Sequence, residues 1–124
     1  MPVRSLNSAV LKWPDGSAVL SAARSWANAL QCKDPAVRQV WCVGSYARGD
    51  WGVGSDLDLI VILSESDLSP VDRYRTYYPD KLPVPVDLWV HTETEWHALR
   101  VSAPQLGDRI QREKIVLAGS DADS

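Results

Sequence analysis

The chain has 124 residues, 45% of them hydrophobic and 23% charged, which is typical of one globular domain with one hydrophobic core. Its net charge of −3 and isoelectric point near 5.2 argue against broad nucleic-acid binding, which needs a basic surface. No apolar run approaches the roughly 20 residues of a membrane span, and the N-terminus lacks a signal-like apolar segment. We therefore expect a cytoplasmic protein with one domain over residues 1–124, poorly ordered at 1–14 and 119–124.

The first predicted elements are a helix and a strand. Residues 14–16 form a turn signal, Pro-Asp-Gly. A helix is predicted over 17–30, because apolar residues recur there on one helical face: Val19, Ala22, Ala23, Trp26 and Leu30. Lys-Asp-Pro at 33–35 ends this pattern, and the apolar run 37–43 predicts a strand.

The two cysteines, Cys32 and Cys42, lack the spacing of metal ligands. One lies near the end of the predicted helix and the other within the predicted strand. We expect both to be buried free thiols.

A phosphate-binding turn is predicted directly after this strand. Gly44 has no Cβ, so the backbone can turn there and approach a ligand closely. Ser45 opens a short helix over 45–48 that ends at Gly49. A helix N-terminus offers free N–H groups, and Ser45 adds a hydroxyl, so the turn suits a phosphate. Arg48 presents a guanidinium that could bind an anion or pair with nearby acids to hold the loop.

Two carboxylates follow at the start of a second predicted strand, over 57–63. Asp56 and Asp58 are two residues apart, so on a strand they point the same way. Unpaired, they would repel each other, and one pKa would rise. Mg²⁺ removes this conflict, because it typically binds one or two carboxylates together with phosphate oxygens. The pair therefore predicts a divalent metal site beside the phosphate turn.

The remaining pattern alternates helices with strands. Ser69 and Pro70 begin a helix in which Val71, Tyr74 and Tyr78 recur at helical spacing. A strand begins near Val86, after two prolines that would fit poorly in a central strand. Thr-Glu-Thr-Glu at 92–95 is a capping box; a helix over 104–112 and a short strand over 115–118 complete the chain. This order predicts an α/β (α+β) fold, a small mixed sheet with helices packed on it.

Asp87 is the third candidate carboxylate. It lies in an apolar strand, on the same face as Trp89 and His91, where a charge is costly unless it is paired or bound to metal. If its strand neighbours 57–63, Asp87 joins Asp56 and Asp58. Alternatively, Asp87 lies at a strand end and faces water.

Residues 44–61, GSYARGDWGVGSDLDLIV, resemble the signature of the nucleotidyltransferase superfamily that includes DNA polymerase beta. Within it, the chain looks most like the minimal nucleotidyltransferases, the MNT group. The matching positions are Gly44, Ser45, Ala47, Arg48, Gly49, Ser55, Asp56, Asp58, Leu59 and Val61.

The resemblance implies the nucleotidyltransferase fold and transfer of a nucleoside monophosphate from an NTP, with ATP favoured, to a hydroxyl. It implies that Gly44 and Ser45 hold the β- and γ-phosphates, and that Asp56 and Asp58 bind Mg²⁺, or Mn²⁺. Asp87 would hold the metal that faces the attacking hydroxyl. Arg48 and Ser55 complete the candidate nucleotide-binding set, although Ser55 is also expected to cap the turn before the strand.

MNT proteins of this size resemble antitoxins whose partner is a helical HEPN ribonuclease. The resemblance implies an antitoxin that adenylylates its toxin; the alternative is a non-catalytic module that binds nucleotide or caps the toxin. Among other residues, Asp50 and His91 are expected at the surface. Trp51 could stack on a base or fold back on the core.

Overall fold

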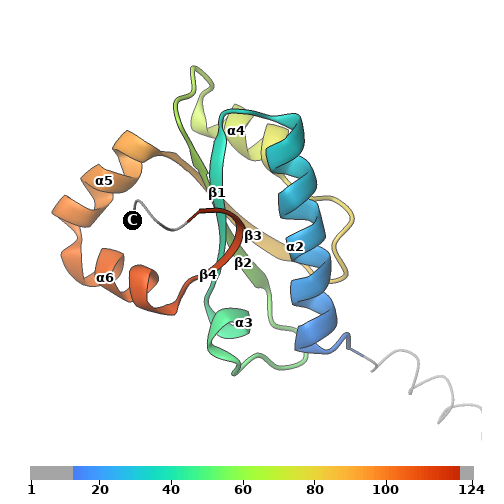
Figure 1. Cartoon of the computed structure of the whole chain (residues 1–124). Coiled ribbons are helices and arrows are strands. Elements are labelled where there is room, and N and C mark those ends of the chain that lie inside the picture. The colour runs from blue at the N-terminus through green and yellow to red at the C-terminus, as the bar shows by residue number, and fades with distance from the viewer. Residues whose placement is uncertain (1–12, 121–124) are drawn as a thin grey trace, which may run out of the picture.

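The structure is a computed structural model that describes residues 13–120. Of the segments expected to be poorly ordered, 1–14 and 119–124, residues 1–12 and 121–124 lie outside this part of the chain. A four-stranded mixed sheet has the order β3-β2-β1-β4 (Figure 1). Its strands are β1 (Val37–Val43), β2 (Leu57–Leu63), β3 (Val86–Thr92) and β4 (Ile115–Gly119). Strand β1 is antiparallel to β2 and β4, and β2 is parallel to β3. The predicted mixed sheet is confirmed.

Helices cover both faces of this sheet (Figure 1). Helices α2 (Gly16–Lys33) and α4 (Pro70–Tyr77) lie on one face, and α5 (Glu93–Ser102) and α6 (Pro104–Glu113) lie on the other. The single-turn helix α3 (Ser45–Arg48) lies at the end of β1. No helix in residues 13–120 is long and apolar enough to cross a membrane.

The larger core lies between the sheet and helix α2. Val19, Ala23 and Ala27 of α2 are fully buried against sheet residues such as Val40 and Leu59. Asp15 caps the helix by accepting a hydrogen bond from the backbone N–H of Ala18, 2.8 Å away. The predicted helix is confirmed, with slightly wider limits than its apolar pattern indicated.

A smaller core on the other face joins the sheet to α5 and α6. Trp41 and Trp96 pack edge to face with their ring centroids 4.9 Å apart. The predicted capping box begins α5: Thr92 Oγ1 accepts from the backbone N–H of Glu95, and Glu95 Oε1 accepts from that of Thr92. This smaller core leaves part of the sheet face open beside α6, where the cleft described below is found.

The residues that α4 buries are mostly not those that recur at apolar spacing. Val71 and Tyr74 are 60% and 46% exposed, whereas Arg73 and Tyr77 are buried. Arg73 donates from Nη1 to Glu95 Oε1 at 2.6 Å and from Nε to the carbonyl oxygen of Leu68 at 3.1 Å. Because these hydrogen bonds satisfy the guanidinium, Arg73 can be buried although it is charged. The apolar residues Val71 and Tyr74 face outward instead.

Three smaller expectations can be compared with the structure. Cys42 is buried as predicted, but Cys32 is exposed, because it lies on the solvent side of α2. Gly119 belongs to β4, although we expected the tail to begin there. Pairing of β3 begins at Val86, as predicted, and its position at the edge of the sheet accommodates the prolines before it.

Replacing Arg73 with Met should test whether the Arg73–Glu95 contact stabilises the fold. The variant keeps much of the apolar volume but removes the partner of Glu95, so we expect the free energy of unfolding to fall by about 1–3 kcal/mol. Urea denaturation measures this change. Arg75→Met, on the same helix but exposed, should change it by less than about 0.5 kcal/mol; equal effects would show that the contact contributes little.

Candidate functional site

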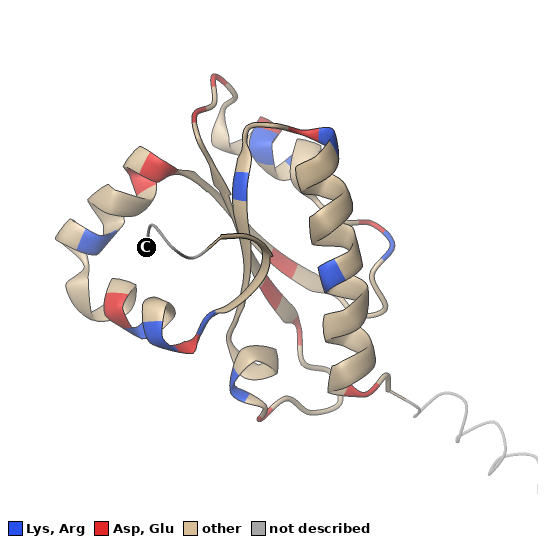
Figure 2. Ribbon diagram, in the orientation of Figure 1, with Lys and Arg blue, Asp and Glu red and all other residues tan. Residues whose placement is uncertain are grey.

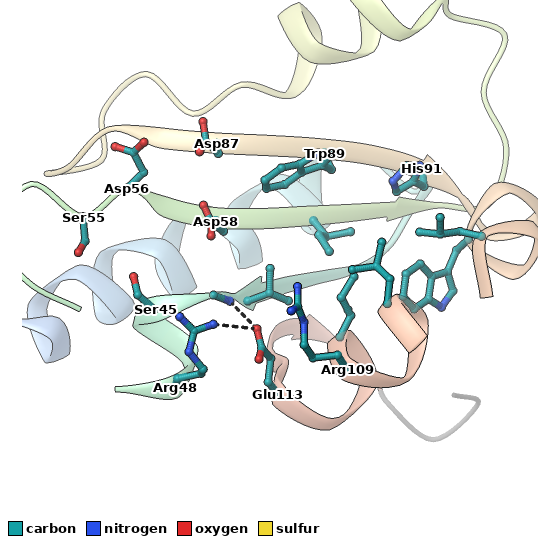
Figure 3. A pocket seen from close by; sticks show the side chains of 17 residues that line it. Ser45, Arg48, Ser55, Asp56, Asp58, Asp87, Trp89, His91, Arg109 and Glu113 are labelled. Atoms are coloured by element: carbon teal, nitrogen blue, oxygen red, sulfur yellow. Dashed lines mark hydrogen bonds and ion pairs between the residues drawn. The ribbon is translucent and has the colours of Figure 1, made fainter. Parts of the chain in front are cut away.

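A cleft of about 610 Å³ opens between the sheet and α6. Its walls come from the ends of β1 and β2, from β3, and from helices α5 and α6 (Figure 3). Every candidate site residue named from the sequence lines it: Gly44, Ser45, Arg48, Ser55, Asp56, Asp58 and Asp87. The structure therefore brings the whole predicted set to one concave surface.

The three aspartates group at one end of this cleft (Figure 3). The parallel register of β2 and β3 pairs Asp58 directly with Asp87, and Figure 2 shows acidic residues in both strands. Asp56 lies immediately before β2, on the same side as Asp58 (Figure 3). Asp56 and Asp87 are exposed to solvent, whereas Asp58 is half-buried.

The environment of Asp58 disfavours its charge. Burial raises the pKa of the Asp58 carboxyl to about 6, and the neighbouring carboxylates of Asp87 and Asp56 add to the effect. At pH 7 most Asp58 side chains are ionised and lie beside two further acids. A bound cation would relieve this repulsion.

Gly44 places the phosphate turn against Asp58. The antiparallel register pairs Val43 with Asp58, so the turn leaves β1 next to that carboxylate. Gly44 has φ +76°, and a Cβ built there would collide with Asp58 Oδ2. The backbone conformation requires glycine, and a Cβ there would also force the Asp58 carboxylate to move.

Helix α3 follows this turn. Its hydrogen bonds run from the N–H of Arg48 to the oxygen of Gly44 and from the N–H of Gly49 to the oxygen of Ser45, both 2.9 Å. The Ser45 side chain points into the cleft toward the aspartates (Figure 3). The hydroxyl and the amides of the first turn of α3 can therefore serve a phosphate.

Arg48 pairs with acids other than the three aspartates. Its Nε lies 3.0 Å from Asp50 Oδ2, and its Nη1 lies 3.4 Å from Glu113 Oε1. The hydrogen bond to Asp50 is the main cause that raises the pKa of the guanidinium. Asp50 is exposed as expected, but it also pairs with Arg48 and is not only solvated. Glu113, which also lines the cleft, escaped the sequence analysis because no motif marks an acid 65 residues beyond Arg48.

Two residues of the loop after α3 have structural contacts. Trp51 stacks on Tyr46, with ring centroids 5.5 Å apart and planes 6° from parallel, and it packs against the larger core. Of the two predictions for Trp51, the structure supports packing against the core. Ser55 Oγ accepts from the backbone N–H of Gly52 at 2.8 Å, so Ser55 caps the turn as expected.

The far half of the cleft is mainly apolar. It is formed by Trp89, Trp96, Leu99, Leu106 and Ile110. His91, expected at the surface, lines this half; it is half-buried, and burial lowers its pKa. The cleft thus has an acidic end suited to metal and phosphate and an apolar end suited to an uncharged group.

The acidic end fits a metal that shares its ligands with a substrate. Within residues 13–120, no three His, Cys, Asp or Glu side chains form a ready-made cage for a metal ion. The carboxylates are nevertheless the hard oxygen ligands that Mg²⁺ prefers, and Mg²⁺ typically takes only one or two of them besides phosphate oxygens and water. The residues present fit that mode of binding.

Solved structures with the same fold include a candidate nucleotidyltransferase and toxin–antitoxin proteins. A Sulfolobus solfataricus protein described as a candidate nucleotidyltransferase aligns with a TM-score of 0.63 at 19% identity, over 86% of each chain. A double mutant of the toxin–antitoxin pair MntA–HpeT aligns with a TM-score of 0.58 at 19% identity, over 84% of this chain and 76% of that one. A toxin–antitoxin structure with AMP-PNP aligns with a TM-score of 0.55 at 23% identity, over 76% and 70%.

A search of curated protein sequences finds no match to the chain. The family model described as "Nucleotidyltransferase domain" matches residues 24–117, which include all four strands up to Leu117 and every residue of the acidic end. The chain therefore belongs to the nucleotidyltransferase domain family.

Proposed function

We propose that this nucleotidyltransferase moves AMP from ATP to a hydroxyl acceptor in a Mg²⁺-dependent reaction. The observation that carries the proposal is the register of β2 and β3, which sets Asp58 beside Asp87, with Asp56 and the Gly44–Ser45 turn in the same cleft. Two-metal phosphoryl transfer needs such carboxylates next to a phosphate site.

The donor phosphates would bind at the Gly44–Ser45 turn. Ser45 contributes its hydroxyl, and the first amides of α3 contribute N–H donors to the β- and γ-phosphates. The structural neighbour with AMP-PNP supports an adenine nucleotide as the donor. Because Arg48 already pairs with Asp50 and Glu113, its proposed role is to hold the loop, and contact with phosphate would require it to leave one of them.

The charge of the cleft supports a requirement for cations. Four carboxylates line it (Asp56, Asp58, Asp87 and Glu113), and two arginines do (Arg48 and Arg109). With all six ionised the lining carries a formal charge of −2, so a triphosphate would be repelled. Mg²⁺, when bound, supplies the missing positive charge and lowers the barrier to attack on phosphorus.

The proposed reaction is a single displacement at the α-phosphorus. The acceptor oxygen forms a bond to the α-phosphorus as the bond to the oxygen that bridges to the β-phosphate breaks, and that electron pair leaves with pyrophosphate. Asp87 lies across β2 from the phosphate turn, so it would face the acceptor hydroxyl and accept or steer the proton released there. Asp56 and Asp58 would orient the donor between the phosphate turn and Asp87.

A second candidate function is capping of a toxin without catalysis. The likeness to the MntA–HpeT toxin–antitoxin pair supports a toxin as partner. The resemblance to the MNT group makes a helical HEPN protein the proposed type. Trp89 and Leu106, both partly exposed at the cleft, give apolar surface to such a partner. An antitoxin that adenylylates its toxin would combine both functions in one complex.

Asp87→Asn tests the proposed catalytic role. The amide keeps the shape but loses the charge that serves the attacking hydroxyl. Transfer of label from α-labelled ATP to a toxin partner recovered with the protein from its host should therefore fall at least about 100-fold. Affinity for nucleotide, measured separately, should change by less than about fivefold, since Asp56 and Asp58 remain.

Asp80→Asn, at an exposed acid outside the cleft, is the matched control and should transfer label normally. Full transfer by the Asp87 variant would remove that residue from the mechanism. If the wild type binds nucleotide and toxin but transfers no label, the capping function is favoured.

Metal binding should depend on pH through Asp58. Since its pKa is raised to about 6, a metal must displace a proton below that pH. Affinity for Mn²⁺ with AMP-PNP should therefore be nearly constant above pH 7 and fall up to about tenfold for each pH unit below 6. Electron paramagnetic resonance of free Mn²⁺ measures this affinity. Asp58→Asn should bind more weakly and lose this dependence; a variant that keeps it would assign the titration to another group.

A further inference from the structure

Glu113 joins the end of helix α6 to the phosphate turn. It is the last residue of α6, and 18% of its side chain is exposed. Its Oε1 accepts a hydrogen bond from the backbone N–H of Gly44 at 3.0 Å and lies 3.4 Å from Arg48 Nη1 (Figure 3). One carboxylate oxygen therefore binds both ends of α3, from an element 69 residues away in sequence.

The phosphate turn needs such outside support. Helix α3 is a single turn of four residues, and isolated helical turns are unstable because nucleation is unfavourable. Gly44 has a positive φ and the greatest backbone freedom of any residue. Hydrogen bonds to charged groups are stronger than neutral ones, so the Glu113 contact restrains the most flexible point of the turn.

The ion pair between Glu113 and Arg48 is linked to the loop before β2. Arg48, held by Glu113, also binds Asp50 at 3.0 Å. Glu113, Arg48 and Asp50 thus form a chain of charges from α6 across α3 to the loop. Arg48 carries one positive charge against the two negative charges of Glu113 and Asp50. Glu113 therefore adds repulsion toward any triphosphate.

We propose that Glu113 is a positioning residue, which orients the Ser45 hydroxyl and the amides of α3 toward the donor phosphates. This rests on the proposed binding of nucleotide at the Gly44–Ser45 turn. Glu113 improves nucleotide binding despite its charge, because a fixed turn avoids the entropy loss of ordering the backbone on binding. The opposite role, competition with phosphate for Gly44 and Arg48, predicts the opposite sign when Glu113 is removed.

Glu113→Ala and Glu113→Gln separate the two roles. We expect Ala to weaken the affinity for Mn²⁺ with AMP-PNP roughly tenfold, because the turn loses its restraint. Gln keeps an oxygen that can accept from Gly44 N–H, so its affinity should stay within about threefold of the wild type. Calorimetric titration of the full chain measures both. Asp108→Ala removes the same charge from an exposed position of α6 outside the cleft and should bind as the wild type does.

Hydrogen exchange at the Gly44 amide tests the inference in the absence of nucleotide. The amide should exchange at least about tenfold faster in Glu113→Ala than in the wild type, and Glu113→Gln should restore protection. Equal protection in all three, or tighter nucleotide binding by Ala, would overturn the positioning role. Should the wild type bind no nucleotide while exchange follows this pattern, the proposed function fails and the restraint on the turn stands.

Discussion

The parallel pairing of β2 with β3 is the constraint on which the acidic end of the cleft depends. It sets Asp58 beside Asp87 across one sheet spacing, although the two residues are 29 positions apart in the chain. The antiparallel pairing of β1 with β2 then brings Gly44 against the same carboxylate. Three separate segments meet around Asp58 because backbone ladders fix the three strands that carry or precede them. The sheet thereby keeps the acids close together despite their mutual repulsion.

Local patterns predicted the elements well because each had its own signal. The run 37–43, the capping box at Thr92 and the Ser69–Pro70 helix start all appear in the structure where they were expected. The alternation of β3 correctly put Asp87, Trp89 and His91 on one face, and that face lines the cleft. Such signals depend on residues within a few positions of one another, which a single sequence displays.

Contacts between distant segments could not be predicted in the same way. Val71, Tyr74 and Tyr78 recur at helical spacing, yet Val71 and Tyr74 are exposed. Arg73 is buried instead, because its partner Glu95 comes from another helix. Glu113 escaped notice for a related reason, since its partners Gly44 and Arg48 lie far back in the chain. In both cases a polar side chain is placed by a long-range partner, and hydrophobic periodicity carries no information about such partners.

The position of β3 at the edge of the sheet has a mechanical consequence. Within residues 13–120, β3 pairs with β2 on one side and has no strand on the other. The separation of Asp87 from Asp58 is therefore set by one ladder and by the elements attached to the strand, whereas Asp58 is clamped between two neighbours. A strand with one neighbour makes fewer contacts than a strand with two, and segments with fewer contacts open more easily. A partner protein that packs along the β3 edge would therefore shift Asp87 rather than Asp56 or Asp58.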